Sequence, residues 1–524
     1  MKNKIIIGVL AGLASLIIVI KLLTIFVVEP WIGNKIQTSV AKINNSYSIK
    51  IDKVHIKWIS RSLELNGIKL ISKPEQNGKT EMNASVSSIH VSGIRVFQWL
   101  FNHQIEMREI LVSGSDIRGK IPFSNKNTPP IVAPMNIHIG ELLFDTLQGE
   151  ISNTLNTQTW SLEKGIVKLS DIKLNERDTL SAKCIHGIDF KATAVGLVSS
   201  DSLYAYQAHD IIYSGSSKTI VVDRFNIQPA FPDEEFAAKH EFQTDRIEAD
   251  FKRIFVYSFS VTDFVRYGSI KSSFVEIGNM DMKVFRDKRM KFRHENKPVF
   301  QEMIRNYPSL LSVDTVSLLN GDINYAVRTV KANETGNLSF KQVRAKIYKI
   351  SNDSIYKLKK AFFELQAEGF LMGQGKLIVQ LKSEINQPSN VFSLEGSLSE
   401  MEASALNPIL EKSALIKVNS GKITSMNFDF VADDTNSTGS LMLLYQGLDL
   451  AILNKKTEKT TALKEEIISA FINMKVLDSN PLKGESLRKG IIYSKRDPEK
   501  FLFNYCFRSI VSGIEYSIVK SKKK

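Results

Sequence analysis

The sequence predicts a mainly β protein in which one N-terminal transmembrane helix is followed by an elongated, curled antiparallel sheet with short helices at both ends. Three observations support this prediction. An apolar run begins at Ile5, apolar and polar residues alternate in short runs from Tyr47 onward, and turn residues interrupt the alternation about every ten to fifteen positions. Alternation with period two is typical of antiparallel strands that bury one face.

The apolar run Ile5–Val28 predicts a transmembrane helix. At ~1.5 Å per residue it spans roughly 36 Å, slightly more than the hydrocarbon thickness of a bilayer, which is about 30 Å. Lys21 is the one charged residue in the run, and its long side chain can reach the headgroups. Because Lys2 and Lys4 precede the run, residues 1–4 are expected in the cytoplasm and the rest of the chain across the membrane.

A cleaved signal peptide is the alternative interpretation of this run, since the two N-terminal lysines also suit a signal sequence. The run is longer than the ~7 to 15 residues of a signal-peptide core, however, and Val27–Trp31 contains no small-x-small cleavage motif. We therefore expect an uncleaved anchor.

The composition is that of an ordinary globular protein and specifies no function, with 43% hydrophobic and 24% charged residues. The formal net charge of +14 suits nucleic acid or anionic lipid, or reflects scattered solvated lysines. Export across a membrane favours lipid, so no nucleic-acid partner is expected. Cys184 and Cys506 are the two cysteines, which excludes a disulfide framework and a cysteine zinc site.

The segment after the anchor, residues 29–46, predicts a short juxtamembrane helix, either at the bilayer or packed on the end of the sheet. Residues 47–390 then read as a long series of strands. The apolar residues at helical spacing in the first segment are Ile32, Ile36, Val40 and Ile43.

An internal repeat supports the strand series. The segment Ile89–Ile117 aligns without a gap, at an offset of 165, with Ile254–Met282. Each copy reads as a strand, one or two helical turns around Trp99 or Phe264, a strand, a turn and a strand. Two independent segments of similar pattern are the alternative. Coinciding apolar pairs include Ile89/Ile254, Val91/Val256, Ile110/Val275 and Val112/Ile277.

The C-terminal region, residues 391–524, predicts strands followed by two helices. The first helix is expected from Thr461 to about Val476. The second is expected to begin with Asp497 as N-cap and Pro498 at the first helical position. Its predicted apolar face consists of Phe503, Cys506, Phe507, Ile510 and Ile514, with Cys506 as a small buried hydrophobe.

Part of this region resembles a known family. Ser420–Ile423, Met426–Phe430, Thr438–Leu441 and Tyr445 are similar to the C-terminal module of the AsmA-like family of Gram-negative envelope proteins, over residues 391–519. The resemblance implies one inner-membrane helix and a periplasmic sheet folded like a taco around a hydrophobic groove. It also implies a role in outer-membrane biogenesis and lipid homeostasis.

Related large proteins are lipid-transfer bridges, and this chain is short by comparison. About 30 strands at ~4.8 Å would reach roughly 140 Å, which leaves a shuttle, a partial bridge or a scaffold as the expected roles.

We therefore predict a membrane-anchored periplasmic protein that binds or conducts lipid, phospholipid in particular, in a β-groove. A non-enzymatic envelope scaffold or assembly factor that binds protein partners is the alternative. A sheet curled tightly enough to fill its interior with its own side chains would also give the same periodicity. The residues predicted to line the groove are Ile89, Val91, Ile110, Val112, Ile254, Val256, Val275, Ile277, Phe428, Phe430, Leu441 and Leu443.

The sequence predicts no catalytic, cofactor or metal residues, and hence no enzyme. No two of the eight histidines lie closer than thirteen residues apart, and neither an HExxH nor a GxSxG motif occurs. Gly369–Lys376 misses the spacing of a phosphate-binding loop and reads as a turn. The acidic pairs Asp433–Asp434 and Glu465–Glu466 are interpreted as solvated.

Overall fold

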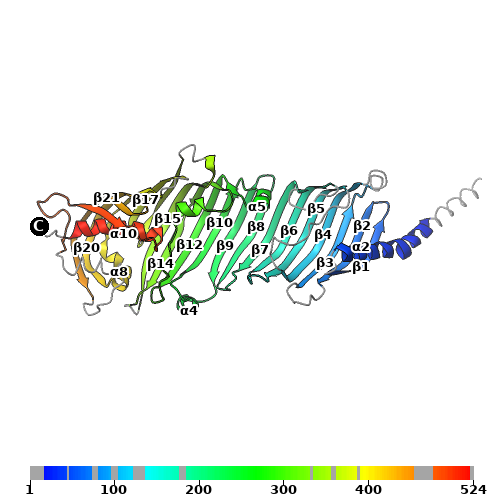
Figure 1. Cartoon of the computed structure of the whole chain (residues 1–524), viewed down its shortest axis with the longest axis horizontal. Coiled ribbons are helices and arrows are strands. Elements are labelled where there is room, and N and C mark those ends of the chain that lie inside the picture. Colours follow the sequence, from blue (N-terminus) through cyan, green and yellow to red (C-terminus); the bar gives the residue numbers. More distant parts are fainter. Residues whose placement is uncertain are drawn as a thin grey trace, which may run out of the picture. The chain divides into compact units, whose positions relative to one another are not determined.

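The computed structural model describes residues 17–43, 47–72, 81–95, 104–121, 136–175, 184–330, 334–355, 361–385, 390–453 and 476–519. The chain divides into two compact units, Met1–Lys218 (unit 1) and Thr219–Lys524 (unit 2). Together they contain 22 strands, so the predicted mainly β fold is confirmed. Figure 1 shows the strands of each unit arranged side by side.

Unit 1 begins with a helix and continues as a ladder of strands. A π-helical turn, η1 (Thr24–Val28), leads into α2 (Glu29–Ile43). Each described strand pairs with the next in chain order, and all these pairs are antiparallel except β4–β5, which is parallel. The strands are β1 (Tyr47–Lys57), β2 (Ser62–Ser72), β3 (Glu81–Ser92), β4 (Gln104–Ile121), β5 (Asn136–Asn153), β6 (Thr159–Leu174), β7 (Gly187–Val198) and β8 (Tyr204–Ser214).

Unit 2 is a longer ladder with several short helices. Its strands are β9 (Thr219–Pro229), β10 (Asp245–Tyr257), β11 (Ile270–Ser272), β12 (Phe274–Asp287), β13 (Leu311–Leu318), β14 (Gly321–Arg328), β15 (Thr335–Ser351), β16 (Phe362–Leu371), β17 (Gly375–Glu384), β18 (Phe392–Leu398), β19 (Met401–Glu402), β20 (Ile416–Ala432), β21 (Asn436–Ile452) and β22 (Lys489–Lys495). Its helices are α4 (Asp233–Ala238), α5 (Val261–Tyr267), α6 (Phe300–Arg305), η3 (Ala403–Leu406), α8 (Asn407–Ser413) and α10 (Leu502–Ile518).

The sheet is largely antiparallel, as predicted, with parallel pairs at two places. In unit 1, β4 and β5 are parallel; in unit 2, β11 and β12 are parallel to β13 and β14. A parallel pair requires the chain to return to the edge of the sheet at which the first strand began. In unit 2 this crossover is residues 288–310, which include α6. The corresponding crossover of unit 1 lies outside the described residues.

The predicted repeat is confirmed at the level of strand pairing, but the strand, turn and strand predicted for its second half form one continuous strand, β4, in unit 1. Ile89 lies opposite Val112, and at the offset of 165 Ile254 lies opposite Ile277. The strands β3 and β10 also end at equivalent positions. The next residue, Gly93 after β3 and Ser258 after β10, has a positive φ in both copies. The helical turn expected around Phe264 is α5, whereas the turn expected around Trp99 lies outside the described residues.

The N-terminal predictions agree with the described residues as far as these reach. The helix Ile17–Thr38 is long and apolar enough to cross a membrane, although Ile5 and its neighbours up to residue 16 lie outside the described part. The helix expected after the apolar run is α2, and the change to strands falls at Tyr47 as predicted; its position next to a membrane stays a prediction. The helix expected from Thr461 lies outside the described residues.

The last helix begins four residues later than predicted. Its N-cap is Phe501 and its first residue is Leu502. The Asp497 carboxylate instead accepts a hydrogen bond from the backbone N–H of Glu499 at 3.0 Å, which closes a turn ahead of the helix. An Asp-Pro pair therefore initiates this turn and does not cap α10.

The buried face of α10 also differs from the predicted one. Phe503 and Phe507 are 64% and 42% exposed. The reason is close approach to the sheet, because a Cβ on Gly513 would lie 2.8 Å from Ile492 Cγ1. Cys506, Ile510 and Ile514 pack at the edges of this contact. The buried residues of the helix are Tyr505, Ser509, Gly513, Ser517 and Ile518.

Candidate functional site, an apolar sheet face

One face of the unit 1 sheet carries uninterrupted rows of apolar side chains. Residues directly opposite each other on paired strands point to the same face, so the pairing register defines each row. One row crosses all eight strands. It consists of Val54, Leu65, Ile89, Val112, Phe144, Val167, Phe190 and Tyr213. The adjacent row consists of Ile56, Leu63, Val91, Ile110, Leu142, Leu169 and Ile188.

Unit 2 has the same organisation over more strands. Its first row consists of Val222, Ile254, Ile277, Leu318, Ala345, Ala367, Val379, Gly396, Phe428, Leu441 and Gly490. Its second row consists of Ile220, Val256, Val275, Val316, Ile347, Leu365, Leu381, Leu394, Phe430, Gly439 and Ile492. We call the face that carries these rows the apolar face of each unit.

The opposite face is charged. Arg224 Nε lies 2.7 Å from Asp250 Oδ1 across β9 and β10, and Lys168 Nζ lies 2.7 Å from Glu141 Oε2 across β5 and β6. The hydrogen bond to Glu141 raises the pKa of Lys168. Cross-strand pairs of this kind are typical of a solvated sheet surface. The two faces therefore differ clearly in polarity.

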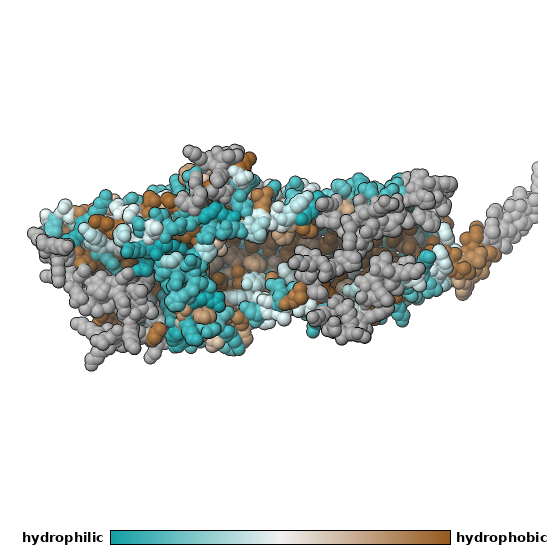
Figure 2. Space-filling view, viewed as in Figure 1, coloured by the Kyte–Doolittle hydropathy of each residue, from teal (hydrophilic) through white to brown (hydrophobic). Residues whose placement is uncertain are grey.

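The apolar face is hollowed and only partly covered. Figure 2 shows hydrophobic surface recessed between hydrophilic rims, over strands of unit 1 and over strands of unit 2. Of the eight predicted lining residues in β3, β4, β10 and β12, Val91 and Val112 are buried and the other six are half-buried. Phe144 and Phe190 lie on the same face and follow the same alternation, although they are not among the predicted lining residues.

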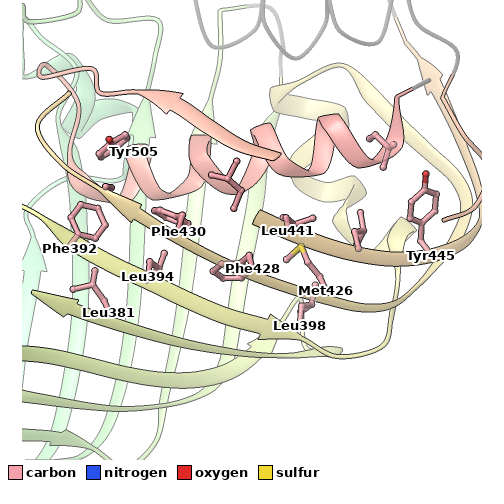
Figure 3. Packing of buried hydrophobic residues seen from close by; sticks show 14 of the residues in the cluster. Leu381, Phe392, Leu394, Leu398, Met426, Phe428, Phe430, Leu441, Tyr445 and Tyr505 are labelled. Atoms are coloured by element: carbon pink, nitrogen blue, oxygen red, sulfur yellow. The ribbon is translucent and has the colours of Figure 1, made fainter. Parts of the chain in front are cut away.

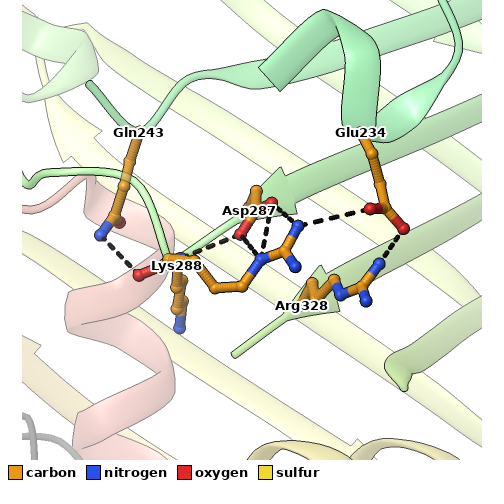
Figure 4. A network of polar contacts seen from close by, with 6 residues as sticks. Glu234, Gln243, Asp287, Lys288 and Arg328 are labelled. Carbon is orange, nitrogen blue, oxygen red and sulfur yellow. Dashed lines mark hydrogen bonds and ion pairs between the residues drawn. The ribbon is translucent and has the colours of Figure 1, made fainter. Parts of the chain in front are cut away.

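The crossover of unit 2 is fixed at its start by a polar network at one edge of the sheet (Figure 4). Asp287, at the end of β12, accepts hydrogen bonds from the backbone N–H and the Nε of Arg289, both at 2.9 Å. Arg289 and Arg328 both pair with Glu234 of α4. The network thus holds the end of β12 to α4 and β14.

The same crossover is fixed further along to the apolar face. The backbone N–H of Lys297 donates to the carbonyl of Pro498 at 2.7 Å. The Phe300 ring lies 4.3 Å from the Phe363 ring of β16, and Gln301 Nε2 donates to Ser383 Oγ at 3.2 Å. Because Phe363 and Ser383 share the face of Leu365 and its row, the crossover lies across the apolar face.

Beyond the crossover, α10 packs on the apolar face (Figure 3). Phe428 and Phe430 are each 3% exposed, and Leu441 is fully buried. They belong to one hydrophobic cluster with Tyr505 of α10. The four candidates in β20 and β21, including Leu443, therefore lie on the predicted face but form a packed core. They are not available to line an open groove.

The described residues contain no cluster of three or more His, Cys, Asp or Glu side chains that could hold a metal ion. Burial raises the pKa of the Cys506 thiol to about 12, which removes its nucleophilic form at neutral pH. A pocket of about 300 Å³ is lined by polar-face side chains such as Gln380, Glu395 and Asn427, and also by Gly396 and Phe428 of the first apolar row.

Comparison with known proteins adds no relative: no family model matches the chain, and no curated protein is significantly similar to it. The fold defines a class, a largely antiparallel sheet with one apolar face that follows a helix able to cross a membrane. The AsmA-like resemblance of residues 391–519 stays a prediction.

Proposed function

We propose that this protein is an AsmA-like envelope protein, anchored in the inner membrane by its N-terminal helix, that binds or conducts lipid along the apolar face in the periplasm. The observation that carries the proposal is the unbroken apolar register, eight strands long in unit 1, on a face whose side chains are half-buried over much of its extent. In this role the protein contributes to outer-membrane biogenesis and lipid homeostasis.

Acyl chains are the ligand that such a surface suits best. They need no hydrogen-bond partner, and each methylene removed from water contributes about 0.8 kcal/mol. A row such as Val256, Val275 and Val316 offers continuous contact from strand to strand. No catalytic residue is required for a chain to move along it. The phosphate and other polar groups of a phospholipid can stay at the hydrophilic rim.

Site-specific photocrosslinking of the full-length chain tests this proposal. A benzophenone side chain is introduced at Val275 or Ile277 in cells grown with radiolabelled phosphate, and the purified protein is analysed for covalently attached lipid. Both side chains are half-buried on the apolar face, so both positions are expected to label. Crosslinking at a defined position separates groove lipid from lipid around the membrane helix.

Lys346 is the matched control, because it lies on β15 next to Ile347 but on the opposite, exposed face. It should yield little or no lipid adduct. Equal labelling at Lys346 and Val275, or no labelling at either apolar position, would contradict the proposal. Adducts at Val275 that contain polypeptide and no lipid would favour the scaffold.

A further inference from the structure

The N-terminal helix is joined to the edge strand β1 at three points. The indole Nε1 of Trp58 donates to Thr24 Oγ1 at 2.9 Å. The backbone N–H of Ile56 donates to the Glu29 carboxylate at 2.8 Å. Farther along, Gly33 is so close to Val54 that a Cβ on it would lie 3.3 Å from Val54 Cγ2.

These contacts run in matched order, with the helix antiparallel to the strand. Nine residues from Thr24 to Gly33 rise about 13.5 Å at ~1.5 Å each. Four residues from Trp58 to Val54 cover about 13 Å at ~3.3 Å each. Thr24 and Glu29 are 5% and 8% exposed, so both polar contacts are shielded from solvent. These contacts therefore fix the position of β1 along the helix axis.

The register places the β1–β2 turn beside the apolar part of the helix. Glu29 is the first charged residue after the apolar run, and it lies level with Ile56. Trp58 lies level with Thr24, which is five residues or about 7.5 Å further into that run. Ile59 follows Trp58 at the tip of the turn and is fully exposed, while Trp58 is 57% exposed.

We propose that the β1–β2 turn is a second membrane contact, which inserts Ile59 and Trp58 into the boundary between headgroups and acyl chains of the leaflet that the helix enters. Tryptophan is enriched at this depth, and here its N–H already has a protein acceptor, so insertion leaves no unpaired donor. Lys53, Lys57 and Arg61 are exposed nearby, where anionic headgroups would attract them. The first strand of the apolar face would then end at the bilayer surface.

This inference rests on the membrane anchor of the proposed function and not on lipid loading of the sheet. The full-length chain carrying Ile59→Cys is labelled with an environment-sensitive NBD fluorophore and reconstituted into phosphatidylethanolamine–phosphatidylglycerol vesicles. The native cysteines react poorly, because Cys184 is buried and the pKa of Cys506 is raised to about 12. Fluorophore attached to the native cysteines is measured on the unsubstituted protein and subtracted as background.

Leu155→Cys is the matched control. Leu155 is also an exposed apolar residue at a hairpin turn of unit 1, at 64% exposure, but the parallel β4–β5 pair places the β5–β6 turn at the opposite edge of the sheet. We expect blue-shifted emission at position 59, quenched several-fold by lipids with a nitroxide at a shallow acyl carbon. Position 155 should show water-like emission and little quenching.

Two contrary outcomes are distinguishable. Water-like emission at position 59, with a membrane-embedded signal from Leu22→Cys on the helix, would overturn the inference and leave the proposed function intact. Water-like emission at both positions 59 and 22 would overturn the inference and the anchor together. Because Ile59 is fully exposed, Ile59→Lys should fold normally yet lose the interaction, and its Trp58 fluorescence should red-shift in vesicles.

Discussion

The two ends of the apolar face in unit 2 carry the same kinds of residue in the same register, yet only one end is a core. Ile254 and Ile277 of β10 and β12 are half-buried, whereas Phe428 and Leu441 further along the same row are 3% exposed and fully buried. The strands do not differ in pattern. The covering elements differ, because α10 and the crossover lie over the second region.

An apolar sheet face therefore needs a cover, but its residue pattern does not determine whether a helix of the same chain or another molecule provides it. At the C-terminal end a helix from the same chain supplies the cover, and its small-residue face lets it approach closely. Over β10 and β12 the half-buried side chains leave contact area for another molecule. The distinction between core and groove thus depends on elements remote in sequence.

The largest difference between the two regions should be seen on truncation of one side chain in each. Phe428→Ala removes a fully packed ring and should lower the free energy of unfolding of unit 2 by about 3–5 kcal/mol. Ile277→Ala in the same row should cost clearly less, because its side chain is half-exposed already. Urea unfolding of the two variants measures both values. Equal losses would mean that β12 is as tightly packed as β20.

A charge on the apolar face should separate binding from folding. Val275→Asp places a carboxylate in the proposed path of the acyl chains, and burying it under lipid would cost several kcal/mol, so lipid labelling at Ile277 should fall roughly tenfold or more. Lys346→Asp on the polar face should leave labelling unchanged. Melting temperatures of both variants serve as the control for folding. Equal lipid labelling in the two variants would contradict the assignment of the faces.

The close approach of α10 should be sensitive to a larger side chain. Gly513→Val would push Cβ against Ile492 and Leu441 and should cost about 1–3 kcal/mol through overpacking. Phe503→Val, which introduces the same residue on the exposed face of the helix, should change stability by no more than about 0.5 kcal/mol. Similar effects at both positions would show that the helix does not rest on its small residues.

The face and register of the strands could be predicted from the sequence because period-two alternation is a local signal. The alternation alone assigns Ile89, Val112, Ile254 and Ile277 to the apolar face. In the structure Ile89 lies directly opposite Val112, and Ile254 lies directly opposite Ile277. The parallel steps could not be predicted, since the alternation is identical whichever direction the neighbouring strand runs.

The sequence patterns also could not predict how α10 covers the C-terminal strands. Large apolar residues such as Phe503 and Phe507 suggested the buried stripe of α10, but a helix packed close to a sheet buries small residues. Ser509 and Gly513 are inconspicuous in sequence. Their burial is explained by the hydrogen bond of Ser509 to Ser437 and by the close approach of Gly513 to Ile492 and Leu441. This is why the four candidates in β20 and β21 were assigned to the groove.

The smallest expected effect concerns the polar network that fixes the start of the crossover between the two regions. Burial alone would raise the pKa of Asp287, but hydrogen bonds from Arg289, together with its charge, outweigh burial and lower that pKa from 3.8. A carboxyl whose pKa is lowered on folding stabilises the protein above its unfolded pKa, and this stability is lost as the pH falls below about 3.8 through the folded value. Asp287→Asn should therefore cost about 1 kcal/mol at pH 7, given that Arg289 is partly exposed, and nothing once the pH is well below the folded pKa. Unfolding measured over this pH range in both proteins checks the sign, and a difference that persisted in acid would assign the loss to packing and not to charge.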